Sequence, residues 1–475
     1  MAKSLPPAGQ FDFSRGVINT INTFIAPPNS VRHAINFVFD EEYGSAKVRR
    51  GSTIVGAQLT SNNNVLGMHN HRDRDGGAHA LLAGVNGTIY NVATGSALRG
   101  GMSANATMQF ETYLDETVVQ NGTDAPLAFT GTGSFGVSTT LDTANMPIGV
   151  DVLNFKDRLW VLQASGILRG SSIPQSPSYN TISWTSGNKT IPIDPDASSY
   201  TGSGIGLARA GGLLLIFKER AMYTYNGSAT QADFLYDVGC SSVRSIGSGG
   251  GYVFFFNSDG IWRTVGERPQ RISRPVQAYI DGMSSANLSS VAGHANGQYY
   301  WCSIGDVTIG LTTYTNVVLR YSIATEEWAV LSYANRPTAF SQYINGTAVT
   351  VAYGETTARV LTIDSGTTDN ETAIECELLS HPFIFGSRGL MKDVHDKFLA
   401  YTQNSSDLEI QFRVNRGDFV TVGHAMKQIE EVPIMAGTFG NILEVRFIGS
   451  SIGTQTIIDG FEMPRVSTTG YGSTQ

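Results

Sequence analysis

The residues best suited to chemistry lie in one short tract near the start of the chain, Met68-His69-Asn70-His71-Arg72-Asp73-Arg74-Asp75. On a strand, His69 and His71 would point to the same side. Together with Asp73 and Asp75 they offer imidazole and carboxylate groups of the kind that bind divalent metals. Two interleaved arginines oppose a bound cation, so we expect a charged loop at a sheet edge and keep these four residues only as weak metal candidates.

Other catalytic patterns are missing from the sequence. It contains no G-x-S-x-G, H-E-x-x-H or P-loop motif, and the adjacent Glu326 and Glu327 would point to opposite faces of a strand. The segment 258–262 has the letters of a sialidase Asp-box at the wrong spacing, and it predicts a type I′ hairpin turn instead. We therefore predict no catalytic residue, no cofactor and no enzymatic activity. The alternative is a carbohydrate-binding or carbohydrate-hydrolysing protein.

Two basic stretches are candidates for contacts with partners. One contains Arg49 and Arg50, and the denser one contains Arg268, Arg271 and Arg274 in a loop with two prolines. The net charge of −8 argues against a protein that binds the nucleic-acid backbone, which needs clustered cations. For the second stretch we therefore favour contact with another protein over contact with DNA.

The composition predicts many short strands joined by tight turns. Charged residues make up only 15% of the 475 residues and glycine is frequent, which also suits a subunit that buries much surface in an assembly. The three cysteines, Cys240, Cys302 and Cys376, are too far apart in sequence to suggest a disulfide scaffold or a zinc site. The longest apolar run, at 213–217, is too short to span a membrane.

From about residue 64 the sequence repeats a hairpin, in which an apolar strand, a turn with glycine and an aromatic strand follow one another. Copies recur at a period of roughly 35 to 50 residues, which is the length of one propeller blade. Runs such as Leu213–Phe217 are apolar at every position, which favours strands buried on both faces over a β-sandwich. We expect a β-propeller of six or seven blades, some incomplete. The copies lie at 79–92, 116–129, 158–170, 211–227, 251–266, 297–303 with 316–331, and 347–363.

The two ends of the chain differ from its middle. Residues 1–60 contain two Pro-Pro pairs and predict an extended N-terminal arm, followed by the propeller domain over 61–366. Residues 367–466 alternate between polar and apolar positions, as at 408–414, and predict a C-terminal antiparallel β-sandwich. Residues 467–475 are polar and predict a flexible tail. The chain is thus expected to be all-β.

Four stretches resemble one protein family, the propeller-bearing tail proteins of short-tailed bacteriophages, called tail hub, nozzle or packaged-DNA stabilisation proteins. The stretch 251–280 is the most specific of the four, because a hairpin, the pattern Gly-x-x-Pro-x-x-Ile-Ser and a short helix follow one another in the family's order. The long Ser/Thr/Pro stretch at 171–204 has no counterpart in the family pattern. The four stretches are 27–56, 213–229, 251–280 and 317–332.

The resemblance implies a structural role in the virion. Identical subunits, six in number, would form a ring that extends the DNA channel below the portal and its adaptor. The subunit ring would help to retain packaged DNA and would dock tail fibres and a needle or plug, while DNA passes through without sequence-specific binding. Assembly would take place in the host cytoplasm. The N-terminal arm or the C-terminal sandwich is the expected contact with the adaptor.

Overall fold

A computed structural model gives the fold. It describes residues 3–5, 8–20, 25–40, 42–60, 62–76, 79–174, 180–193, 201–345, 348–383, 391–395, 397–404, 407–426, 428–433, 439–440, 442–451, 454–463 and 465–469. These residues form ten antiparallel sheets and a few short helical turns, so the chain is all-β as predicted. None of the described helices is both long and apolar enough to cross a membrane.

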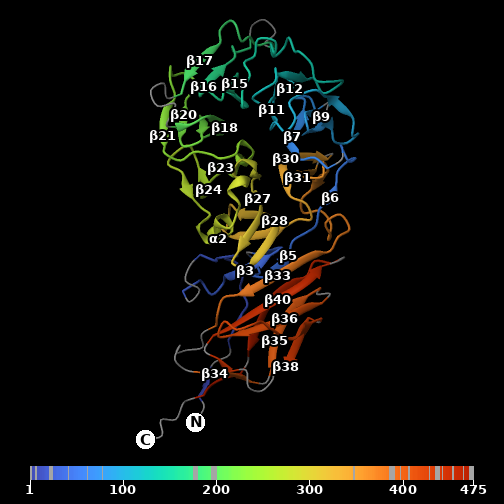
Figure 1. Cartoon of the computed structure of the whole chain (residues 1–475), viewed down its shortest axis with the longest axis vertical. Helices are drawn as coiled ribbons and strands as arrows, with labels where there is room; N and C mark the ends of the chain where they lie inside the picture. The colour runs from blue at the N-terminus through green and yellow to red at the C-terminus, as the bar shows by residue number, and fades with distance from the viewer. Residues whose placement is uncertain are drawn as a thin grey trace.

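Seven of the sheets follow one another along residues 65–362 (Figure 1). In the first six of them the strands pair in chain order, as short turns favour, whereas the seventh also takes in a strand from before residue 65. The first four sheets comprise β7 (Val65–Arg72), β8 (His79–Val85), β9 (Thr88–Asn91) and β10 (Ala97–Arg99); β11 (Gln109–Tyr113), β12 (Glu116–Gln120) and β13 (Leu127–Phe129); β14 (Asp151–Phe155), β15 (Arg158–Leu162), β16 (Ile167–Gly170) and β17 (Lys189–Pro192); and β18 (Gly204–Ala210), β19 (Leu213–Lys218), β20 (Met222–Tyr225) and β21 (Asp233–Tyr236).

The remaining three of these sheets complete a cyclic arrangement. The first strand of each sheet contacts the first strand of the next, and β30 of the seventh sheet returns to β7 of the first. We call this arrangement the seven-sheet ring. These sheets comprise β22 (Gly247–Gly249), β23 (Tyr252–Asn257), β24 (Gly260–Thr264) and β25 (Gln270–Arg271); β26 (Ala292–Ala295), β27 (Tyr299–Ile309), β28 (Thr312–Ser322) and β29 (Trp328–Ser332); and β30 (Pro337–Asn345), β31 (Ala348–Glu355), β32 (Val360–Thr362) and β6 (Thr53–Ile54).

The predicted hairpins form pairs of neighbouring strands in these sheets, for example β8 with β9 and β23 with β24. The apolar runs are buried on both faces. Leu214 and Ile216 of β19 pack in the cluster between the third and fourth sheets, whereas Leu215 and Phe217 pack in the cluster between the fourth and fifth sheets. Each such side chain contributes about 1.5–3 kcal/mol of burial free energy, so these runs hold neighbouring sheets together.

The turns only partly follow the predictions. Asn86 and Gly87 both have positive φ, as a type I′ turn requires. The type I′ turn predicted for the segment 258–262 is wrong, because Ser258 and Asp259 are not among the positive-φ residues. There the Asn257 side chain accepts hydrogen bonds from the backbone N–H groups of Asp259 and Gly260, which supports a turn without left-handed residues.

Short helical turns connect the fourth to the sixth sheet. They are η1 (Val243–Ser245), η2 (Arg274–Val276), α2 (Gln277–Asp281) and η3 (Ser285–Ser290). The short helix expected after the Ile-Ser pair at 272–273 is therefore present as η2 and α2. Pro275 lies in the first turn of η2, where its missing N–H costs nothing.

Three further sheets lie below the seven-sheet ring in Figure 1 and contain the first and the last of the described strands. We call them the C-terminal sheets. The two larger ones pack face to face through aromatic side chains, since the ring centroids of Phe398 and Phe412 lie 5.1 Å apart. Their strands are β1 (Lys3–Leu5), β2 (Ala8–Gln10), β3 (Val31–Ile35), β4 (Phe37–Phe39), β5 (Ala46–Val48), β33 (Ile374–Ser380), β34 (Met391–His395), β35 (Lys397–Gln403), β36 (Leu408–Val414), β37 (Val420–Ala425), β38 (Ile429–Pro433), β39 (Phe439–Gly440), β40 (Leu443–Ser451), β41 (Ile457–Met463) and β42 (Arg465–Thr469).

The expectation of a separate extended arm over residues 1–60 is wrong. Strand β3 pairs with β33, β5 pairs with β41, and β6 pairs with β32 of the seventh sheet. The physical reason is that β3 to β5 are apolar strands with buried side chains, and alone they would leave their backbone groups unpaired. The flexible tail predicted for 467–475 is wrong for 467–469, because these residues belong to β42. Residues 470–475 lie outside the described residues.

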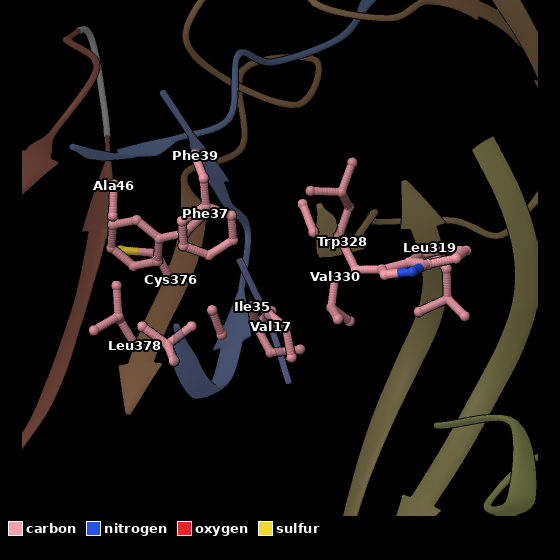
Figure 2. Close-up of a cluster of buried hydrophobic side chains, with 14 of the residues drawn as sticks. Val17, Ile35, Phe37, Phe39, Ala46, Leu319, Trp328, Val330, Cys376 and Leu378 are labelled. Carbon is pink, nitrogen blue, oxygen red and sulfur yellow. The ribbon is translucent and has the colours of Figure 1, made fainter. Parts of the chain in front are cut away.

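One continuous hydrophobic core joins the seven-sheet ring to the C-terminal sheets. Figure 2 shows Leu319, Trp328 and Val330 of the sixth sheet beside the N-terminal Ile35 and Phe37. On the other side of these N-terminal residues lie Cys376 and Leu378 of β33 (Figure 2). The N-terminal strands are therefore the layer between the two parts of the molecule.

Candidate functional site

The histidine tract lies on β7, at the boundary between the first and second sheets. His69 Nε2 is hydrogen-bonded with Thr112 Oγ1 at 2.7 Å, and His71 Nδ1 with Thr117 Oγ1 at 2.8 Å. The two threonine hydroxyls lie 2.6 Å apart and join these bonds into one chain. Burial lowers the pKa of His69 to about 4 and also lowers that of His71, so both imidazoles are neutral at pH 7.

The two aspartates of the tract lie differently. Asp73 Oδ1 is 3.0 Å from His71 Nε2, whereas Asp75 is exposed. Within the described ranges, no three His, Cys, Asp or Glu side chains come together in a way that could hold a metal ion. The tract therefore supplies polar, hydrogen-bonded contacts between the first and second sheets.

Arg49 is not available to a partner, contrary to its selection as an interaction candidate. It is 2% exposed, and its guanidinium forms a two-bond pair with the Asp369 carboxylate. It also donates to Asn36 Oδ1 and to the Ser332 carbonyl, and it lies 4.1 Å from the centroid of the Tyr333 ring. Arg49 therefore ties the N-terminal layer to the sixth sheet and to the segment after the seventh.

The other arginine candidates lie nearer the surface. Arg50, Arg268 and Arg274 are exposed and Arg271 is half-buried. Arg268 donates to the Tyr236 hydroxyl over 3.0 Å and lies 5.3 Å from the centroid of its ring. These side chains keep the accessibility that a contact with a partner requires.

A cavity of about 450 Å³ lies against the first strands of the second, third and fourth sheets, beside η1. Glu111 of β11 accepts hydrogen bonds from Arg209 Nη2 at 2.6 Å and from the Asn154 N–H at 3.1 Å. Burial nevertheless raises the pKa of Glu111 to about 7.

Asp151 of β14 lines the same cavity. Its carboxylate accepts hydrogen bonds from the backbone N–H groups of Leu207 and Val152. Burial raises the pKa of Asp151 to about 7, and the nearby Glu111 charge adds to the effect. The cavity thus brings together two carboxyl groups with raised pKa values and Arg209. Sequence reasoning missed both acids, because their 40-residue separation resembles no motif.

A third set of polar groups lies at the junction between the seven-sheet ring and the C-terminal sheets. The Tyr279 hydroxyl of α2 is hydrogen-bonded with His33 Nδ1 of β3 at 2.5 Å. Trp328 Nε1 donates to the Ile272 carbonyl at 3.2 Å, and the Val17 N–H donates to the Trp328 carbonyl at 2.9 Å. The junction is therefore held by specific hydrogen bonds as well as by the shared core.

Comparison with known proteins gives no family. No protein-family model and no curated protein matches this chain. Among solved structures, a match is the computationally designed Ika8 protein, with 12% sequence identity and a TM-score of 0.35 over 65% of this chain and all of that protein. A TM-score at this level carries no argument about fold or function.

Proposed function

We propose that this chain is a non-enzymatic structural subunit in the tail of a short-tailed bacteriophage, of the nozzle or tail hub kind. In this role, six identical subunits form a ring that extends the DNA channel below the portal and adaptor. The subunit ring helps to retain packaged DNA and docks fibres and a needle or plug. The protein belongs to the virion and is assembled in the host cytoplasm.

The observation that carries the proposal is where the family-like stretches meet. His33 belongs to the stretch 27–56, Tyr279 to 251–280 and Trp328 to 317–332. All three lie at the junction between the seven-sheet ring and the C-terminal sheets, where His33 is bonded to Tyr279 and Trp328 to Ile272. These three stretches are remote in sequence but contact one another at this junction. Their contact supports the resemblance to the phage tail family, because a chance likeness of single hairpins would not place all three stretches at the same junction.

We further propose that the seven-sheet ring is a seven-bladed β-propeller with an incomplete second blade. Three observations support it: the cyclic contacts between first strands, the burial of strands on both faces, and the strand β6. Strand β6 precedes β7 in the chain yet pairs with β32 of the seventh sheet. The last sheet is thus built from both ends of the segment, which opposes opening of the ring.

The surface charges suit assembly with proteins more than binding to DNA. The net charge is −8, and the exposed Arg268 and Arg274 lie on either side of β25, in the β24–β25 turn and at the start of η2. Heterologous contacts between identical subunits generate closed rings when the rotation closes. We assign Arg268 and Arg274 to such a contact or to one with the adaptor.

Electron microscopy of the purified chain, alone and mixed with portal and adaptor, tests the proposal. We expect rings with an axial channel. The charge-reversed variant Arg268→Glu/Arg274→Glu should form fewer rings, whereas Arg99→Glu, which reverses an exposed arginine on β10, should assemble like the wild type. Monomeric particles under all conditions, with the adaptor present, would overturn the proposal.

A further inference from the structure

A second cavity, of about 440 Å³, lies between the C-terminal sheets and the sixth sheet. One wall is the β4–β5 hairpin, with Phe39, Asp40 and Lys47. The other wall is formed by the turns at the ends of β27 and β28, with Tyr299, Arg320 and Glu327. Its volume falls within the range of about 300–1,000 Å³ that is usual for sites of small ligands.

Arg320 is the unusual group in this cavity. It is 5% exposed, and its Nε has no hydrogen-bond partner. Its Nη2 lies 3.5 Å from Glu327 Oε1, which is long for a charge-assisted hydrogen bond. The guanidinium stacks over the Tyr299 ring, 4.3 Å from its centroid. Buried donors without acceptors are costly, so the site favours a ligand that brings oxygen acceptors.

Thr325 adds a second group of this kind. Its hydroxyl is buried, has no hydrogen-bond partner and belongs to the same wall of the cavity. A hydroxyl can donate and accept at once. This wall therefore has two buried polar groups without a hydrogen-bond partner: Arg320 Nε, which can only donate, and the Thr325 hydroxyl, which can donate and accept.

The charges around the cavity balance. Arg320 lies beside Glu327, and Lys47 is bonded to Asp40. An anionic ligand would meet two carboxylates and a cationic ligand two cations, so a ligand with net charge gains little. A neutral ligand with several hydroxyl groups can accept from the cations and donate to the carboxylates together.

We infer that this cavity is a binding site for a neutral saccharide unit. Hydroxyl groups of a sugar match the paired donors and acceptors, and its C–H face matches the apolar surface of Val38, Phe39 and Tyr299. The site needs both parts of the molecule, since each supplies one wall. The inference goes beyond the proposed tail role and does not depend on it.

Titration of the full chain with single neutral mono- and disaccharides, followed by calorimetry and saturation-transfer NMR, tests this site. Acetate and phosphate at matched ionic strength serve as charged probes. We expect at least one neutral sugar to bind with millimolar affinity and the two anions not to bind. If no neutral sugar binds, or if the anions bind at this cavity instead, the inference is overturned.

A matched pair of variants locates the binding. Ala324 is exposed in the β28–β29 turn at the cavity, and Ala93 is exposed in the corresponding β9–β10 turn of the first sheet, with Val92-Ala93-Thr94 matching Ile323-Ala324-Thr325. Ala324→Trp should fill the cavity and weaken binding about tenfold or more. Ala93→Trp should bind like the wild type. Equal affinities of the two variants would overturn the inference.

A second variant keeps the test independent of steric damage. Arg320→Gln/Glu327→Gln removes both buried charges together and leaves neither one unpaired. It should retain the thermal unfolding temperature within a few degrees and lose saccharide binding. Retained binding in this folded variant would also contradict the assignment.

Discussion

The hydroxyl of Tyr279 is hydrogen-bonded with His33 Nδ1 across the junction between α2 and β3, and both side chains are buried. The aromatic ring of Tyr314 lies 4.8 Å from the His33 imidazole and closes the other side of this pair. The bond joins residues 246 positions apart in the chain. It therefore reports directly on whether the seven-sheet ring and the C-terminal sheets are docked.

Tyr279→Phe should destabilise the protein by about 1–3 kcal/mol, because it leaves His33 Nδ1 buried without its hydrogen-bond partner. Urea denaturation measures the free energy of unfolding. Tyr43→Phe is the control, since Tyr43 is 71% exposed and should change stability by less than about 0.5 kcal/mol. Equal effects of the two substitutions would show that the junction bond contributes nothing.

Arg49→Ala should cost about 3–5 kcal/mol, because it leaves the buried Asp369 carboxylate without its partner. Arg49→Lys should recover only part of this loss, since an ammonium cannot reproduce the two-bond pair. The neighbouring Arg50 is exposed, so Arg50→Ala serves as the control with a change within about 0.5 kcal/mol. Urea denaturation of the three variants separates these outcomes, and similar stabilities of Arg49→Ala and Arg50→Ala would refute the assignment.

The buried histidines should make the protein less stable in mild acid. Burial lowers the pKa of His33 and of His69 from 6.5 to about 4. The unfolded chain then binds protons first as the pH falls, so stability is lost between pH 6.5 and 4 and levels off below. Each histidine contributes at most about 3 kcal/mol to this loss.

His69→Gln should flatten the dependence of unfolding free energy on pH over that window. His424→Gln is the matched control, because His424 is exposed on β37 beside Asp407. Denaturation curves at pH 4.5, 5.5, 6.5 and 7.5 measure the slopes. If both variants keep the wild-type slope, protonation of His69 does not limit stability in acid.

Glu111 should have the opposite effect on stability. Burial raises the pKa of its carboxyl from 4.5 to about 7, so the folded state keeps its proton longer than the unfolded state does. Its contribution is fully present below pH 4.5 and is lost as the pH rises through 7. Glu111→Gln should therefore gain stability relative to the wild type between pH 5 and 8.

The control for Glu111 is Glu431→Gln, an exposed acid whose carboxylate pairs with Lys397. Its difference from the wild type should stay constant between pH 5 and 8, within about 0.5 kcal/mol. The quantity to compare is the difference in unfolding free energy from the wild type at each pH. A constant difference for Glu111→Gln as well would contradict the raised pKa.

The sequence allowed prediction of those strands whose pattern is local. The hairpins and the runs apolar at every position predicted sheets stacked on both faces, and the side chains of β19 lie in that way. First strands such as β22, with the sequence Gly-Ser-Gly, carry almost no local signal and are defined by pairing with a neighbour. The turns at Leu114-Asp115 and Lys156-Asp157 have positive φ without any glycine, so composition could not reveal them.

The candidate sites were less predictable than the fold. Arg49 and Arg50 are neighbours of the same type, yet one is buried and the other exposed, and only the long-range partner Asp369 distinguishes them. Nothing in the local sequence marks Arg320, because its relation to Lys47 and Asp40 depends on how the two parts of the molecule pack. Sites formed between distant segments leave no spacing in the sequence.

The pairing of β3 with β33 has a consequence for synthesis on the ribosome. Strand β3 ends at Ile35 and its partner β33 begins at Ile374. The ribosome must therefore add more than three hundred residues before β3 can pair with β33. During translation the backbone edges of β3 are open to wrong partners, and pairing over such separations is slow. Chaperones that shield the nascent N-terminal segment should therefore raise the yield of native protein more than chaperones that act after release.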